Sequence, residues 1–599
     1  MNFRFSSAAA IVLAASLVGS YAYAGDPPAP AKKKQVAKKP PKPTVEDQIQ
    51  SLRQEFQGQI DSLKSDLATK DAQLKQAQQT AADAQAAAAK AESDATAQQQ
   101  ANTENATAVS TLKSTVDDMR NTNALAVSSL SDETAAIKKA IASPEALNYK
   151  GITISPAGSF IEAATVWRSA ATGGGINTPF TGVPLEHADA AQLSEFFGSG
   201  RQSRIAIKAV GKLPFGTLTG YYEMDWLGTG ITSNNNQSNS YVVRQRQIWS
   251  EAALHSGTTV SAGQMWSLAA ETTKGTSNGS EILPGTIDPQ YTAGFVWTRQ
   301  YGFRVSQKFG KGIWLAASVE NPETLNPAGT INLSTGTTIL LGSGGTGGGL
   351  YNSTANYSFN YTPDFVVKMV AEPGWGHWEV FGIERNFRDR IYHTGSSATN
   401  DSEIGGGIGG GFRAPLANKM LTIGLKGLYG RGVGRYGDST IADITIKPTG
   451  IISPLRGFSA LSTVEINPNK RLSIYMNYGG DLIYRDILAS NDGYGLYSAN
   501  MSGCKTEVAA STTYSNSGTG FGNSSNPANC GGNNKDVQEA TFGYWYNMYN
   551  GPKGRFRYGL QYSYIVRNLW SGNGGTTNPG GTAQGTDNIF ETSLRYYLP

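Results

Sequence analysis

The sequence predicts an all-β transmembrane antiparallel barrel of about 16 strands, preceded by a long α-helical coiled coil. Three observations lead to this fold class. Residues 144–599 contain amphipathic segments of about ten residues, the length that crosses a bilayer when tilted. Tight turns between these segments alternate with long connections rich in Gly, Asn, Ser and Thr. Before them, residues 44–143 carry a helical period of apolar and small residues.

The N-terminus predicts export from the cytoplasm. Arg4 precedes an apolar stretch at 8–18, and Ala22 and Ala24 stand at −3 and −1 from Gly25. This pattern is typical of a secretory signal peptide over residues 1–24, and the apolar run is too short to span a bilayer. The sequence offers no second apolar run of helical type, so membrane insertion requires a closed barrel.

Two segments separate the leader from the strands. Residues 25–43 form a basic linker rich in Pro and Lys that cannot bury a core. It is either a solvated spacer or a segment that adheres to anionic cell-wall polymer or lipid headgroups. Residues 44–143 predict a coiled coil in the periplasm, which ends at Pro144. Partner helices, and therefore a homo-oligomer, are expected because a solitary helix this polar gains little from burial.

After Tyr149 the apolar period becomes two, which predicts strands with one apolar and one polar face. A soluble sandwich would not sort its short and long connections onto opposite ends so consistently, so we favour a membrane barrel with an apolar outer face. The sixteen predicted strands are 160–168, 202–213, 218–227, 241–254, 259–268, 295–308, 313–320, 365–371, 378–388, 404–414, 421–430, 458–466, 472–484, 540–549, 555–568 and 589–598.

The polar strand faces collect charged residues. A lipid-facing Arg or Lys costs about 2–4 kcal/mol at the bilayer midplane, so these side chains are expected in the lumen. They either pair across the barrel and keep the lumen wet, or create a mild preference for anions. The candidate pore-lining residues are Arg204, Lys208, Glu223, Asp225, Arg244, Arg246, Lys426, Arg471, Arg555, Arg557 and Arg595.

Two connections stand out by length and composition. The connection 269–294 is expected to fold inward as a constriction, although a surface shield is the alternative, and its charged residues are Glu271, Lys274, Glu281 and Asp288. The connection 485–539 holds Cys504 and Cys530, and in an exported chain these are expected to form a disulfide. The four histidines are scattered, so we expect no metal site and no cofactor.

The strand motifs and the order of coil before barrel resemble the DcaP-type porins, within the wider class of trimeric sixteen-stranded porins, and are similar to predicted acidobacterial porins. The motifs are 203–209 (SRIAIKA), 220–225 (GYYEMD), 262–267 (AGQMWS) and 318–322 (SVENP). The resemblance implies trimers and uptake of small, often anionic solutes. The chain departs from the usual pattern at its end, where Pro599 replaces the aromatic residue recognised during barrel assembly.

We therefore expect an outer-membrane porin: a passive diffusion channel in the bacterial outer membrane for small hydrophilic solutes, with a mild anion preference. The alternative is a structural tether that joins the outer membrane to peptidoglycan through the coiled coil and the basic linker. No short motif places a nucleophile beside a base, so an enzyme is not expected. The expected partners are outer-membrane lipid and further copies of the chain, and nucleic acid is not among them.

Overall fold

The computed structural model of the 599-residue chain describes residues 147–228, 241–326, 332–342, 358–488, 492–507 and 526–599, with the single residues Lys90 and Met119. The predicted signal peptide (1–24), basic linker (25–43) and coiled coil (44–143) lie outside the described residues, apart from those two. The chain divides into two compact units, Met1–Ser129 and Leu130–Pro599, and every described strand belongs to the second.

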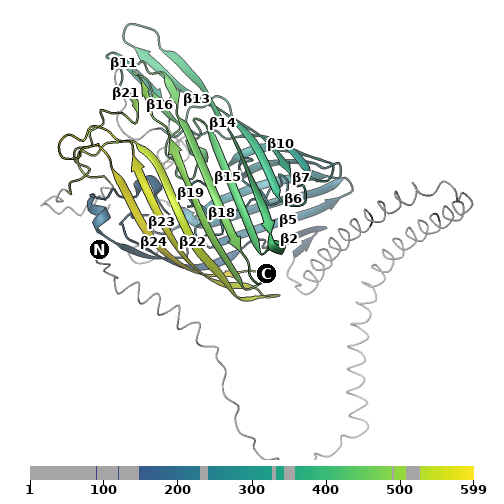
Figure 1. The fold of residues 1–599 in the computed structure, drawn as a ribbon. Coiled ribbons are helices and arrows are strands. Elements are labelled where there is room, and N and C mark those ends of the chain that lie inside the picture. The colour runs from purple at the N-terminus through teal and green to yellow at the C-terminus, as the bar shows by residue number, and fades with distance from the viewer. Residues whose placement is uncertain are drawn as a thin grey trace, which may run out of the picture. The chain divides into compact units, whose positions relative to one another are not determined.

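Twenty antiparallel strands of the second unit belong to one sheet, and sixteen of them form a closed barrel, to which four short strands are added (Figure 1). Its last strand pairs with its first, from Ile589↔Arg168 to Tyr597↔Phe160. The predicted strand number and closure within one chain are therefore confirmed. The barrel strands are β3 (Phe160–Arg168), β5 (Arg204–Leu213), β6 (Gly216–Gly228), β7 (Val242–Leu254), β8 (Thr258–Trp266), β9 (Arg299–Phe309), β10 (Ile313–Glu320), β12 (Asp364–Ala371), β13 (His377–His393), β14 (Thr399–Leu416), β15 (Leu421–Arg431), β18 (Arg456–Ile466), β19 (Leu472–Ile483), β22 (Asn534–Gly551), β23 (Gly554–Leu569) and β24 (Gln584–Tyr597).

The seam between the first two barrel strands is interrupted. β3 pairs with the short strand β4 (Glu195–Ser199) along most of its length and with β5 only at Phe160↔Arg204. Residues 208–211 of β5 pair with β2 (Ile152–Ser155), which in turn pairs with β1 (Leu147–Tyr149). β2 and β3 thus act together as one broken strand beside β4 and β5, and the ladder of hydrogen bonds continues around the barrel.

The strands place apolar side chains outside and polar side chains inside. On β10, Ile313, Leu315 and Val319 are exposed, whereas Trp314, Ala316 and Ser318 are buried. On β12 the exposed Val367 and Met369 flank Lys368, which is fully buried. Since successive residues of a strand face opposite sides, an apolar exterior and a charged interior follow directly from the period-two pattern. No helix in the described part of the chain is both long and apolar enough to cross a membrane.

The connections sort by length onto two rims, the short-turn rim and the long-loop rim, with one exception. The connection 394–398 belongs to the long-loop rim but is a short turn. Strands predicted at 378–388 and 404–414 are in fact longer, because β13 and β14 continue past the rim as a pair, and β13 also pairs there with β11 (Thr337–Leu341) (Figure 1). At this position the paired strands extend beyond the rim, where other strand pairs are joined by a long loop.

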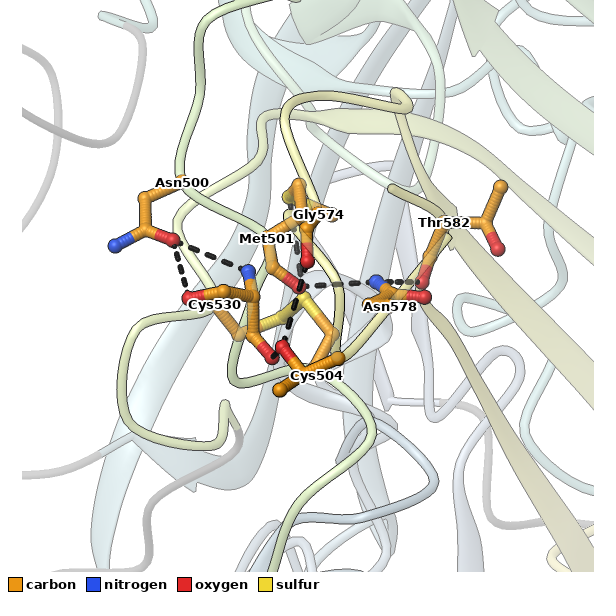
Figure 2. The surroundings of a disulfide bond; sticks show 9 residues. Asn500, Met501, Cys504, Cys530, Gly574, Asn578 and Thr582 are labelled. Atoms are coloured by element: carbon orange, nitrogen blue, oxygen red, sulfur yellow. Dashed lines mark hydrogen bonds between the residues drawn. A yellow bond between two sulfur atoms is a disulfide. The ribbon is translucent and has the colours of Figure 1, made fainter. Parts of the chain in front are cut away.

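The long loops pack together into a collar. One apolar cluster joins Phe387 to the hairpin of β16 (Ile444–Ile446) and β17 (Ile452–Pro454). In another, a disulfide joins Cys504 to Cys530 (Figure 2). The two cysteines belong to an apolar cluster with Met501 and Leu185. The buried Asn578 amide donates to the carbonyls of Met501 (2.9 Å) and Thr582 (3.0 Å), so the loop before β24 is fastened to the loop that carries the disulfide (Figure 2).

Candidate solute passage

The connection 267–298, between β8 and β9, crosses the interior of the barrel; we call it the crossing loop. Its consecutive amides at 292, 293 and 294 donate, in that order, to the carboxylates of Asp438 (2.9 Å), Glu539 (2.8 Å) and Asp481 (3.1 Å). β8 and β9 are the fifth and sixth barrel strands, whereas Asp481 on β19 and Glu539 on β22 belong to the thirteenth and fourteenth. The loop therefore reaches the opposite wall.

A second group of hydrogen bonds holds the middle of the crossing loop. The Trp545 indole on β22 donates to the Gly285 carbonyl at 2.8 Å. The Gln561 side chain on β23 accepts from the Ile287 amide at 2.7 Å and donates to the Asp288 carboxylate at 2.8 Å. Gln561 is 1% exposed, so the donor and the acceptor of its side-chain amide both find partners in the crossing loop at a buried site.

Two buried lysines hold the start of the crossing loop. Lys368 on β12 donates to the Ala270 carbonyl at 2.7 Å, and Lys426 on β15 donates to the Ala269 carbonyl. Glu379 on β13 pairs with both ammonium groups and lies 2.6 Å from that of Lys368. Lys426 is predicted to line the lumen. In the structure Glu379 neutralises its charge, and its ammonium group binds the backbone of the crossing loop.

The predicted charged residues of the crossing loop are placed differently from one another. Glu271 accepts from the Arg413 guanidinium at 3.0 Å, and Lys274 is exposed. Glu281 is partly buried, and burial raises its pKa to about 7. Asp288 is 3% exposed and lies against the far wall. These four side chains do not form one cluster; Glu271 holds the start of the crossing loop and Asp288 holds its middle.

An arginine-rich wall faces the crossing loop on β5, β6 and β7. Register places Arg204, Asp225 and Arg244 side by side across the three strands. Arg244 binds Asp225 through two hydrogen bonds (3.0 and 2.8 Å), and Arg246 binds both Asp225 (2.8 Å) and Glu223. Arg204 lies 3.5 Å from Glu223. Three guanidiniums thus share two carboxylates, so these five residues carry a net charge of +1.

Two cavities flank the crossing loop inside the barrel. The larger, of about 440 Å³, lies toward the short-turn rim, between residues 283–291 of the loop and a wall that includes Arg204 and Arg246. The smaller, of about 180 Å³, lies toward the long-loop rim and is lined by Arg244. Gln290 and Tyr291 line both cavities. The two cavities therefore adjoin at these two loop residues, beside the arginine-rich wall.

Arg557 and Arg595 add to the larger cavity. Arg595 donates to Glu162 at 2.8 Å and to the Ile287 carbonyl, so it joins the first and last strands to the crossing loop. The Arg557 guanidinium stacks over the Trp545 ring at 3.8 Å. Arg557 also donates to the Tyr597 hydroxyl, and among the described residues it forms no ion pair, so these contacts leave its charge unneutralised.

The remaining predicted wall residues lie nearer the short-turn rim. Arg555 stacks over the Tyr597 ring at 4.3 Å, and Lys208 lies on the inner face of β5. Arg471 is exposed in the turn that precedes β19, and its backbone carbonyl accepts from the Asn547 amide at 2.7 Å. Arg471 therefore lies just outside the barrel wall, one residue before the strand, which begins at Leu472 as predicted.

Sequence reasoning missed several residues that shape the passage. Gln290 and Tyr291 sit in the crossing loop, where no strand period marks them, and Gln290 accepts from Arg299 at 2.8 Å. Asp438 belongs to the loop between β15 and β18. Gly294 carried the one available signal: a glycine at the end of the connection, which the structure places at a positive φ of 81°.

Comparisons with known proteins find the same fold. No protein-family model and no curated protein sequence matches the chain. The outer membrane channel DcaP of Acinetobacter baumannii aligns with 76% of this chain and 99% of its own, at 12% identity and a TM-score of 0.51. OmpT of Vibrio cholerae (10% identity, TM-score 0.37, 76% and 100% covered) and an anion-selective porin of Comamonas acidovorans (10%, 0.36, 75% and 99%) superpose less well and support no argument. The similarity to DcaP establishes that this chain has the fold of that sixteen-stranded channel.

Proposed function

We propose that the protein is a porin of the bacterial outer membrane, a passive diffusion channel for small hydrophilic solutes. The observation that carries the proposal is the pair of cavities that adjoin at Gln290 and Tyr291 within a closed, outwardly apolar barrel. A wet interior lined by charges inside an apolar cylinder is the arrangement of a membrane pore. The crossing loop narrows this interior, so it sets the size limit for solutes.

We further propose a mild preference for anions. The wall around Asp225 has one guanidinium more than it has carboxylates, and Arg557 adds a charge whose contacts are the Trp545 and Tyr597 rings and the Tyr597 hydroxyl, none of them a carboxylate. A cleft with an excess of one sign of charge raises the local concentration of the opposite ion. The extensive pairing supports a modest preference over a strong one, because most inward charges are neutralised within the protein.

Planar bilayers test both parts of the proposal. Purified folded barrel should give ohmic conductance steps, and the reversal potential in a KCl gradient should have the sign expected for chloride. Arg244→Ala should move this potential toward potassium, because the Arg244 side chain is 32% exposed at the smaller cavity. Lys212→Ala, an exposed change near the short-turn rim, serves as the control. Folded protein without conductance would overturn the proposal.

For the segments that precede the barrel we propose an envelope role as a second candidate. The lysines of 32–42 and the helical period of 44–143 support a stalk that assembles three copies and contacts peptidoglycan. Deletion of residues 25–143 should then abolish trimers in native mass spectrometry and loosen the envelope while each barrel still conducts. Unchanged trimers would show that the stalk does not direct assembly, and an unchanged envelope would remove the tether.

A further inference from the structure

The outer face of the barrel has a hollow across four neighbouring strands. Gly410, Gly427, Ala460 and Gly480 stand opposite one another in register on β14, β15, β18 and β19. All four lie on the outward face, because on β14 and β15 they alternate with inward residues and share their side with exposed apolar neighbours. A row of residues with almost no side chain leaves a depression where other strands carry Leu, Val or Phe.

At the β18 and β19 end of this row, Ala460 and Gly480 line a groove of about 460 Å³ whose exposed lining is mostly apolar. Leu425, Phe458 and Tyr478 line it and are 46%, 41% and 58% exposed. At its end toward the long-loop rim lies Lys535, whose side chain is 39% exposed and lies 3.3 Å from Asp536. The groove therefore lies over β18, β19 and β22, with a mostly apolar lining and a polar end at Lys535.

A pair of exposed arginines stands above the groove. Arg431 and Arg456 are directly opposite each other on β15 and β18, four positions beyond Gly427 and Ala460 toward the long-loop rim. At about 3.3 Å per residue this is about 13 Å. Arg431 reaches the Pro454 carbonyl at 3.5 Å, and Arg456 stacks over the Tyr484 ring at 5.7 Å. Like charges directly opposite on neighbouring strands repel, so a bound anion would stabilise the pair.

We propose that this face binds a phosphorylated lipid of the outer leaflet, with its phosphate between Arg431 and Arg456 and one acyl chain in the groove. The inference rests on the proposed function, which places this face against lipid. Charge complementarity selects the occupant: two guanidiniums at the headgroup level above an apolar groove match an anionic head and a hydrocarbon tail. A second copy of the chain fits less well, because it would have to bring carboxylates to the same height.

Lipid that copurifies with the full-length protein tests the proposal. The protein is extracted from bacterial membranes in mild detergent, and bound phosphorylated lipid per barrel is measured by native mass spectrometry. The double variant Arg431→Glu/Arg456→Glu removes the charge, and Ala460→Leu/Ser462→Leu fills the groove. Lys212→Glu/Lys308→Glu, two exposed lysines near the short-turn rim, is the charge-matched control. Heat-modifiable mobility on gels confirms that each variant has a folded barrel.

In both test variants the amount of bound lipid per barrel should fall at least tenfold, whereas the control should keep its lipid. The reason for the charge variant is that each arginine near an anionic group contributes an appreciable share of the affinity. Wild-type lipid content in either test variant would overturn the proposal, as would equal loss in the control. A change of oligomer mass without a change in lipid would assign the face to a second copy instead. Conductance is recorded on the same samples. A barrel that binds lipid but does not conduct would refute the proposed channel function and leave the proposed lipid site standing.

Discussion

Replacement of Gly294 by Ala should release the crossing loop from the far wall while the barrel stays folded. A Cβ atom at Gly294 would lie 1.9 Å from the Ala460 carbonyl oxygen and 2.5 Å from the Gly480 amide nitrogen. Both are backbone atoms of barrel strands, so neither can rotate away. The glycine also has a φ of 81°, which L-residues adopt at a cost.

The expected destabilisation follows from these two effects. The left-handed backbone costs about 1–2 kcal/mol for a residue with a Cβ, and overpacking against fixed atoms typically costs about 1–3 kcal/mol. The docked loop thus loses about 2–5 kcal/mol. Each of the three amide–carboxylate hydrogen bonds at 292–294 is worth about 1.5–3 kcal/mol, so the loss is comparable with one or two of them. No strand pairing involves these residues, so the barrel itself is spared.

Single-channel recording measures the result. We expect larger and noisier conductance steps from Gly294→Ala, because the loop spends more time away from the wall. Gly279→Ala is the matched control: it lies in the same loop at a φ of 75°, but its Cβ would meet only Trp249, at 3.8 Å. Wild-type conductance from Gly294→Ala, or an equal change from Gly279→Ala, would refute the reasoning that contact with the far wall holds the loop.

Three further predictions concern pH, charge and the disulfide. Burial, with the nearby Glu539 carboxylate as the second cause, raises the pKa of Asp288 to about 8. Docking of the crossing loop therefore takes up a proton between about pH 4 and pH 8, so the docked loop loses stability as the pH rises through this range. Conductance noise should accordingly rise toward pH 9 in the wild type but not in Asp288→Asn. Glu591 adds repulsion and Arg168 attraction at this carboxyl, so Glu591→Gln should also reduce the pH effect. Cys504→Ser should leave conductance unchanged but speed proteolysis of the collar, since closure of this loop stabilises it by about 3.5 kcal/mol.

The strands were predictable because each carries its own period of two. β3 and β10 have the predicted bounds, and β9 begins at Arg299 instead of residue 295. The difference at β9 has a physical cause: Phe295 is 4% exposed and packs edge-on against Trp266, so its apolar character serves the crossing loop and not the outer face. Local pattern cannot distinguish an apolar residue that faces lipid from one that is buried inside the barrel.

Of the residues that line the passage, only those on barrel strands were predictable from the sequence. Arg204, Arg244 and Arg246 followed from alternation, because a charged residue on the lipid side is too costly. The partners of the crossing loop did not, since Gly294 and Asp481 are 187 residues apart in the chain and no local signal links them. The same gap explains why Lys426 was assigned to the lumen: its inward direction was correct, but its binding to a loop carbonyl depends on where the loop goes.

The inward charges therefore divide into two classes with different effects. Carboxylates such as Asp481 and Glu539 accept backbone amides of the crossing loop, so they set its position and contribute little field to the passage. Because these acids are occupied, a chain with a formal net charge of only +4 can still present excess guanidinium where solutes pass. Asp481→Asn should accordingly raise conductance without a shift of the reversal potential, whereas Arg244→Ala should shift the potential with little change in noise. If instead Asp481→Asn shifts the reversal potential and Arg244→Ala only changes the conductance, the acids and not the arginines determine selectivity.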